Sequence, residues 1–211
     1  MIRTIAGVLW GLSLIPLGAA TGQGGIAGGD LPPPGFGSLN QDQISIRLTA
    51  GDLEIRFLPL DERALRLVAP DGYESLHGLT VSRQAQLDSA AQAAGVAVSG
   101  LALVSFFALR GDARFDPENL NLVYRNQLFR PAAIVPVTAS FSGRQLRVRE
   151  QAAAIYIFAV AIPVFEHFEL SYGGLQSSSW DDVLQRIERE RIRVLSRAQA
   201  DKPDSANPRP Q

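Results

Sequence analysis

The feature that most constrains the fold is the alternation of apolar and polar residues in short runs. Apolar residues occupy every second position in residues 44–48 and again in 53–57, on either side of Ala50-Gly51-Asp52. A period of two places apolar side chains on one face of a β-strand. Two such runs joined by a Gly-containing turn predict an antiparallel hairpin, which Pro59 ends.

Further strands are predicted along the rest of the chain. Residues 96–109 suggest one long strand, buried on both faces for part of its length, with a bulge where the alternation shifts at Phe106-Phe107. Residues 120–124 alternate, and a turn at Asn126-Gln127 leads into a strand that Pro131 and Pro136 interrupt or place at an edge. The remaining expected strands are 146–148, 154–162 and 165–172, with Gly173-Gly174 closing the sheet region.

Residues 61–94 favour helices instead. They are rich in helix formers and poor in β-branched residues, Pro70 stands where a first-turn proline is tolerated, and Gly95 is placed to end the last helix. We expect short helices at about 62–68, 73–79 and 83–94, with Gly72 weakening the second. This region is predicted to be a helical insertion between strands.

A second helical region lies near the C-terminus. Ser179 and Asp182 match a capping box, and apolar residues at helical spacing from Trp180 onward predict an amphipathic helix over about 180–198. The expected solvated face, whose alternative role is partner binding, carries Arg186, Glu188, Arg189, Glu190, Arg191 and Arg193.

Together the patterns predict a mainly β protein, an antiparallel β-sandwich with a short helical insertion (about 61–94) and a C-terminal amphipathic helix (about 180–198). The late Tyr- and Phe-containing strands, with Tyr124-Arg125 and Arg130-Pro131 between them, resemble the immunoglobulin-like sandwich modules of bacterial exported proteins. The resemblance covers about 43–174, although the Cys–Trp–Cys spacing of antibody domains is missing. It implies an architecture and no particular function.

The first 22 residues have the features of a cleaved signal peptide. Arg3 precedes an apolar run over 5–17, and residues 18–22 offer small side chains for cleavage. The run is shorter than the roughly 20 residues of a transmembrane helix, although an uncleaved anchor is the alternative. We expect a flexible Gly/Pro-rich linker at 23–42, the sandwich domain at 43–198 and a disordered tail at 199–211. The mature protein is then periplasmic or extracellular, without a transmembrane anchor.

The amino-acid composition limits which kinds of site and which partners the protein can have. Cysteine is absent, which excludes disulfides, thiolate metal ligands and Cys nucleophiles. The formal net charge is −1, with 20 basic and 21 acidic residues, so the overall basic character typical of nucleic-acid-binding proteins is missing. We expect no cofactor and no nucleic acid, and a partner that is a protein or another component of the cell envelope.

Catalytic and metal signals are weak. The two histidines, His77 and His167, stand far apart in the sequence, and no G-x-S-x-G motif presents a serine nucleophile. His167 lies between Glu166 and Glu169 and could be oriented as a base, but a solvated edge residue is the simpler interpretation. Calcium binding by one loop stays open, since oxygen ligands are offered there by Asp112, Asp116, Glu118 and Asn119.

Arginine and aromatic residues of the second half are the best candidates for ligand binding. Arginine clusters bind carboxylates and phosphates through paired hydrogen bonds. If the sandwich brings the candidates to one end, they form a polar–aromatic surface, and otherwise the arginines only cover a sheet edge with their aliphatic stems. The candidate ligand-binding residues are Tyr124, Arg125, Phe129, Arg130, Arg144 and Arg147.

The function predicted from these observations is that of an exported, non-catalytic binding or interaction module whose partner is unknown. One alternative is a structural or assembly factor of the cell envelope that works through edge-strand addition or helix docking. An open sheet edge beside residues 132–137 would favour it. The other alternative is a hydrolase, which requires His167 or the loop 112–118 to lie in a deep pocket.

Overall fold

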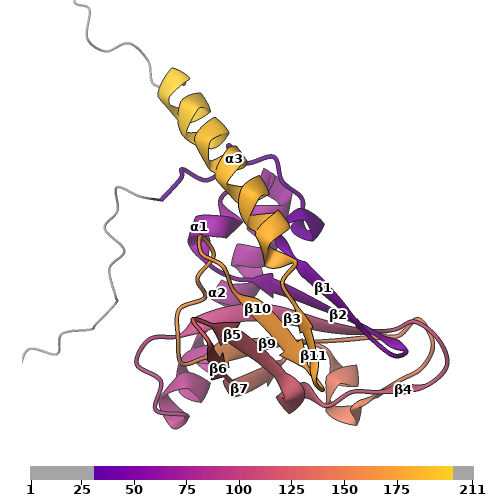
Figure 1. Ribbon diagram of the computed structural model, residues 1–211. Helices are drawn as coiled ribbons and strands as arrows, with labels where there is room; N and C mark the ends of the chain where they lie inside the picture. The colour runs from indigo at the N-terminus through magenta and orange to yellow at the C-terminus, as the bar shows by residue number, and fades with distance from the viewer. Residues whose placement is uncertain (1–30, 202–211) are drawn as a thin grey trace, which may run out of the picture.

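Two antiparallel sheets face each other in the computed structural model, which describes residues 31–201 (Figure 1). The predicted signal peptide, the first part of the predicted linker and most of the predicted tail lie outside these residues. The prediction of a mainly β sandwich with a helical insertion and a C-terminal helix is confirmed. Within 31–201, no helix combines the length and the apolarity needed to cross a bilayer.

The larger sheet has five strands in the order β1-β2-β3-β9-β7. Its first two strands form the predicted hairpin, in which Ala50 lies opposite Leu53. The bulge predicted at Phe106-Phe107 is wrong, because β3 keeps its register with both neighbours through these residues. Phe106 faces the core and Phe107 the opposite side. The strands are β1 (Ile46–Ala50), β2 (Leu53–Pro59), β3 (Gly100–Ala108), β7 (Pro131–Pro136) and β9 (Gln151–Phe158).

The smaller sheet has four strands in the order β11-β10-β5-β6. The turn between β5 and β6 is Arg125-Asn126, not Asn126-Gln127, and both residues have positive φ angles, as two-residue hairpin turns with the favoured twist require. Gly173-Gly174 do not close the sheet region but turn the chain into a further strand. The strands are β5 (Leu120–Tyr124), β6 (Gln127–Phe129), β10 (Glu169–Tyr172) and β11 (Leu175–Ser177).

Short elements connect the two layers at the end away from the helices. The strands β4 (Ala113–Arg114) and β8 (Gln145–Leu146) pair with each other as a separate ribbon. Two 3-10 turns flank them along the chain, η2 (Pro117–Asn119) and η3 (Ala139–Gly143). The hydroxyl of Tyr156 on β9 donates to the carbonyl of Pro117 at 2.9 Å, which ties η2 to the larger sheet.

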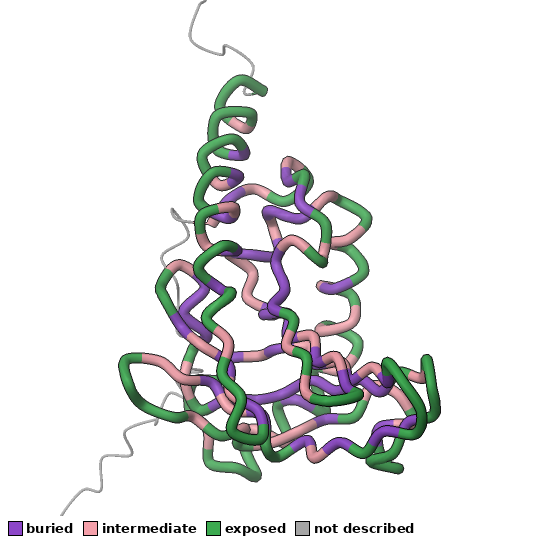
Figure 2. Tube along the Cα trace, turned by 45° about the vertical axis from the view of Figure 1, so that its right-hand side comes forward, coloured by how far each residue is buried: buried purple, intermediate pink, exposed green. Residues whose placement is uncertain are grey.

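The core lies between the sheets and is rich in aromatic rings. The ring centroid of Phe106 on β3 lies 5.9 Å from that of Tyr172 on β10, and Phe57 on β2 lies 6.2 Å from Phe168. Fully burying a large apolar side chain of this kind contributes roughly 1.5–3 kcal/mol. Figure 2 shows the buried residues along the strands and where the helices meet them.

The helical insertion consists of α1 (Glu62–Leu65) and one long helix, α2 (Pro70–Ala93). The two short helices expected at 73–79 and 83–94 are therefore a single one, which runs through Gly72 and Gly78. Each glycine costs a helix about 1 kcal/mol relative to alanine. Packing of α2 against β7, with Leu76 and Leu87 buried, offsets this cost.

The C-terminal helix α3 (Trp180–Ala200) starts against the sandwich and then extends away from it (Figure 1). Trp180 is fully buried, and its ring centroid lies 4.6 Å from that of Phe168. The capping box expected from Ser179 and Asp182 is wrong, since no side chain caps this helix. The Ser179 hydroxyl is hydrogen-bonded to that of Ser177 instead.

The described part of the predicted linker, 31–42, packs onto the domain. Leu39 is buried and bridges to Val68, and η1 (Gln41–Ile44) begins with a capping box between Asn40 and Gln43. Glycine and proline content alone suggested a flexible spacer here. The buried side chain of Leu39, the cap of η1 and the hydrogen bonds from Ser38 to Glu190 hold its second half against the domain.

Candidate functional site

Two of the predicted binding residues, Tyr124 and Arg125, form an exposed cluster with Glu166. The Tyr124 hydroxyl donates to the Glu166 carboxylate at 2.6 Å, and Arg125 donates to the same oxygen at 3.0 Å. The hydrogen bonds from Tyr124 and Arg125 lower the pKa of Glu166. The bond to Glu166 raises the pKa of Tyr124. Because one carboxylate already accepts from both groups, this cluster does not offer an unpaired cation to a ligand.

The other four candidate residues lie elsewhere, so the six residues do not meet at one end of the sandwich. Phe129 packs half-buried against the core, and Arg130 is exposed where the chain crosses from β6 to β7. Arg147 is exposed beside Glu150. Arg144 pairs with Glu118 in the turn before β5, whereas Arg125 follows the last residue of β5. Ligand binding by these residues stays a prediction.

Neither histidine lies in a deep pocket. His77 stacks on Tyr73 and hydrogen-bonds the Glu62 carboxylate at 2.6 Å. His167 hydrogen-bonds Asp181 at 2.6 Å, with 56% of its side chain exposed, and this bond raises its pKa. Neither histidine lines any of five pockets within residues 31–201, which lie at Arg56, Arg147, Pro136, Leu60 and Arg186.

The acidic loop 112–119 uses its carboxylates within the fold. The Asp116 side chain accepts the Glu118 N–H at the start of η2, and Arg144 contacts Glu118 at 3.0 Å and Asp116 at 3.9 Å. Within the described part of the chain, no three acidic or histidine side chains gather as a metal ion would need. The loop is therefore a turn that Asp116 caps and whose two carboxylates lie close to the Arg144 guanidinium.

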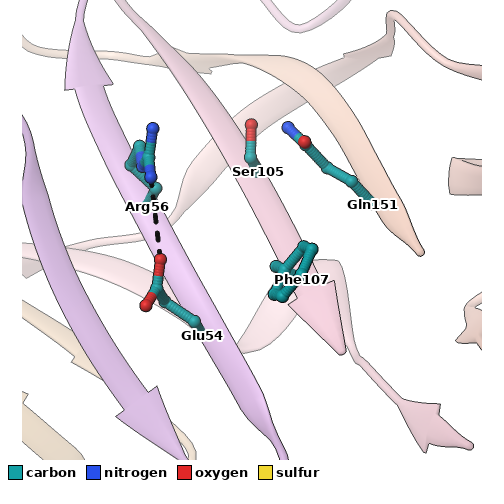
Figure 3. A pocket seen from close by; sticks show the side chains of 5 residues that line it. All are labelled: Glu54, Arg56, Ser105, Phe107 and Gln151. Atoms are coloured by element: carbon teal, nitrogen blue, oxygen red, sulfur yellow. Dashed lines mark ion pairs between the residues drawn. The ribbon is translucent and has the colours of Figure 1, made fainter. Parts of the chain in front are cut away.

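A shallow hollow lies on the outer face of the larger sheet (Figure 3). It has a volume of about 230 Å³ and is lined by side chains from β2, β3 and β9, namely Glu54, Arg56, Ser105, Phe107 and Gln151. Arg56 pairs with Glu54 at 3.7 Å and with Asp42 at 2.7 Å, so its charge is compensated. The lining contains no histidine that could activate Ser105. This hollow can form hydrogen bonds but does not show a catalytic arrangement.

A groove of about 320 Å³ lies at the open side of the sandwich, beside β7. Its apolar walls come from β7, η2 and η3, and the Arg144–Glu118 ion pair also lines it. Only one of the predicted residues, Arg144, belongs to it. The lining residues are Pro117, Glu118, Ile134, Pro136, Phe141, Ser142 and Arg144.

β7 is an edge strand, and α2 packs against it. β7 is the last strand of its sheet, and within 31–201 no strand pairs with its outer side. The Val137 N–H donates to the Ala153 carbonyl on β9. Because backbone N–H and C=O groups alternate in direction along an antiparallel strand, those of Val135 also point toward β9, and those of Ile134 point away from it. The edge position that Pro131 and Pro136 favoured is confirmed. Among the groove residues on η2 and η3, Glu118 was considered only as a possible calcium ligand, and Pro117 and Ser142 were not predicted, because only the fold brings them next to β7.

Comparison with protein families and with curated proteins finds no match. Among solved structures, the chain is similar to a secreted protein from Mycobacterium tuberculosis, MPT63, with 17% sequence identity and a TM-score of 0.32. The match covers 63% of this chain and 87% of that chain.

Proposed function

We propose that the protein is an exported, non-catalytic interaction module that binds an extended segment of a partner protein by adding it as a strand to β7. Export follows from the signal-peptide features of the first 22 residues. The observation that carries the binding proposal is the edge position of β7 beside a groove of mixed apolar and polar lining. In strand addition, backbone hydrogen bonds supply affinity and a side-chain pocket supplies specificity.

The edge admits only a short segment. Pro131 and Pro136 lack a backbone N–H, which is how sheets protect an edge against uncontrolled pairing. Ile134, between them, keeps an outward N–H and C=O. The partner segment would pair with Ile134, place one apolar side chain in the groove and meet both charges of the Arg144–Glu118 pair in its lining.

A random peptide library displayed on phage, selected on the mature protein, would supply the ligand for the test. Kd is then measured by fluorescence anisotropy for the wild-type protein, Ile134→Pro and Ile134→Val. Proline at position 134 removes the N–H that points away from β9 and keeps every N–H that donates to β9. Pro136 already occupies an equivalent position of the strand. Loss of one backbone hydrogen bond with its desolvated partner predicts about tenfold weaker binding to Ile134→Pro.

Ile134→Val is the matched control, since it keeps the N–H and should bind within about twofold of wild type. Circular dichroism of Ile134→Pro checks that the sheet is intact. Selected peptides that bind Ile134→Pro as tightly as the wild-type protein would show that the edge is not the site. Ser142→Trp should fill the groove and so tests the contribution of the bound side chain separately. Its matched control is Ser89→Trp, at an exposed position of α2.

A further inference from the structure

We infer that a second pocket, between α3 and residues 38–43, binds the phosphate group of a phosphate ester. The pocket has a volume of about 230 Å³ and shares no lining residue with the groove at β7. Its polar lining comes from Ser38, Gln43, Arg186, Arg189, Glu190 and Arg193. The two proposals are independent, and either can fail alone.

Three arginines of α3 reach this pocket from one helix face. Arg186, Arg189 and Arg193 stand at i, i+3 and i+7, which places them on the same side of the helix. Arg186 donates one N–H to the Gln43 carbonyl at 2.8 Å, and Arg189 donates its Nε–H to Gln185 at 3.1 Å. A guanidinium has five N–H donors. Arg193 donates one N–H to the Glu190 carboxylate at 3.3 Å. Each of these three bonds takes one donor, so most of the guanidinium donors stay available to a ligand.

The charges of the pocket do not cancel. Glu190 is the single carboxylate among its lining residues, against three guanidinium groups. Glu190 pairs with Arg193 of the pocket at 3.3 Å and with Arg197 outside it at 3.6 Å, whereas Arg186 and Arg189 form no ion pair with a carboxylate within residues 31–201. Arg56 in the outer-face hollow, by contrast, is matched by both Glu54 and Asp42. The pocket at α3 therefore has the excess positive charge that an anion requires.

The shape of the donor set favours phosphate over carboxylate. A carboxylate presents two oxygens in one plane, whereas a phosphate group presents oxygens in several directions that separate guanidinium groups can reach. A volume of about 230 Å³ leaves room for the group that an ester carries as well. Such an ester could be a small soluble molecule or the headgroup of an anionic lipid, and the chemistry of recognition is the same for both.

The test measures binding of two probes to the mature protein. Glycerol 3-phosphate, followed by isothermal titration calorimetry, represents the soluble source. Sedimentation with phosphatidylglycerol vesicles, compared with phosphatidylcholine vesicles, represents the lipid source. Arg189→Gln is the test variant, because the only hydrogen bond of Arg189 in the described chain is to its own helix. Arg110→Gln is the matched control with the same change of charge at an exposed position.

Binding of either probe that falls about tenfold in Arg189→Gln, and less than about twofold in Arg110→Gln, supports the inference. Arg189→Lys, which keeps the charge but loses the fork of donors, should bind between the wild-type protein and Arg189→Gln. Equal losses in Arg189→Gln and Arg110→Gln would reveal a general charge effect and overturn the proposed site. Absence of binding of both probes to the wild-type protein would overturn it as well.

Discussion

Replacing Glu190 with alanine should destabilise the protein through the loss of its contacts to residue 38. Only 1% of the Glu190 side chain is exposed, although it lies on a helix rich in charges. The backbone N–H and the hydroxyl of Ser38 donate to one of its oxygens at 3.0 and 2.7 Å. Arg193 and Arg197 approach the carboxylate at 3.3 and 3.6 Å, with 63% and 50% of their side chains exposed.

The magnitude follows from these two kinds of contact. A hydrogen bond to a charged group contributes about 1.5–3 kcal/mol, and two such bonds from Ser38, each taken at the lower end because they share one carboxylate oxygen, suggest about 3 kcal/mol. The two arginines are solvated, so their ion pairs add only about 0–1 kcal/mol. We therefore expect Glu190→Ala to lower the free energy of unfolding by about 3 kcal/mol. In a domain of this size, that corresponds to a decrease in Tm of roughly 6–12 °C.

Urea denaturation followed by circular dichroism measures the difference, with Glu188→Ala as the exposed control on the same helix. The control should stay within about 0.5 kcal/mol of wild type. Ser38→Ala combined with Glu190→Ala should cost less than the sum of the single changes, because both remove the same hydroxyl contact. If Glu190→Ala proved as stable as Glu188→Ala, the N-terminal segment would not be anchored to α3 as described.

Three further changes have defined outcomes. Tyr156→Phe removes a buried hydrogen bond to the η2 turn and should cost about 1–2 kcal/mol in urea denaturation. The hydrogen bond to Asp181 raises the pKa of His167. The pair therefore stabilises the fold fully below about pH 6.5, and this contribution is lost as pH rises through the pKa of His167 in the folded protein. His167→Gln should flatten the dependence of Tm on pH over that interval. Gly100→Ala would place a methyl group 2.3 Å from the Val160 carbonyl oxygen, and a loss of about 1–3 kcal/mol is expected in thermal unfolding.

The sequence predicts the strands well where local pattern and tertiary packing agree. The first hairpin follows from alternation alone, and Pro131 and Pro136 correctly indicate an edge strand. The single helix α2 was missed because Gly72 weakens it locally, while its packing against β7 stabilises it from a distance. Strand β11 was missed because two adjacent glycines suggest an end as readily as a turn.

The candidate sites depend on contacts between distant parts of the chain. Glu190 was expected on a solvated face, but it lies on the buried stripe between Ile187 and Val194, and its charge is tolerated because Ser38 and two arginines surround it. No local sequence pattern predicts that Glu190 accepts hydrogen bonds from a residue 152 positions away. Arg144 was identified as a binding residue by its type, but its neighbours in the groove are set by the way η2 and η3 meet β7.

Amide hydrogen exchange along β7, measured by NMR on the mature protein, tests the open edge most directly. The Val135 and Val137 amides, which face β9, should be protected, whereas the Ile134 amide should exchange as fast as an exposed loop amide. Addition of a selected peptide should then protect Ile134 and leave its neighbours unchanged. An Ile134 amide already as protected as Val135 in the free protein would mean that the edge is covered, and it would contradict strand addition at β7.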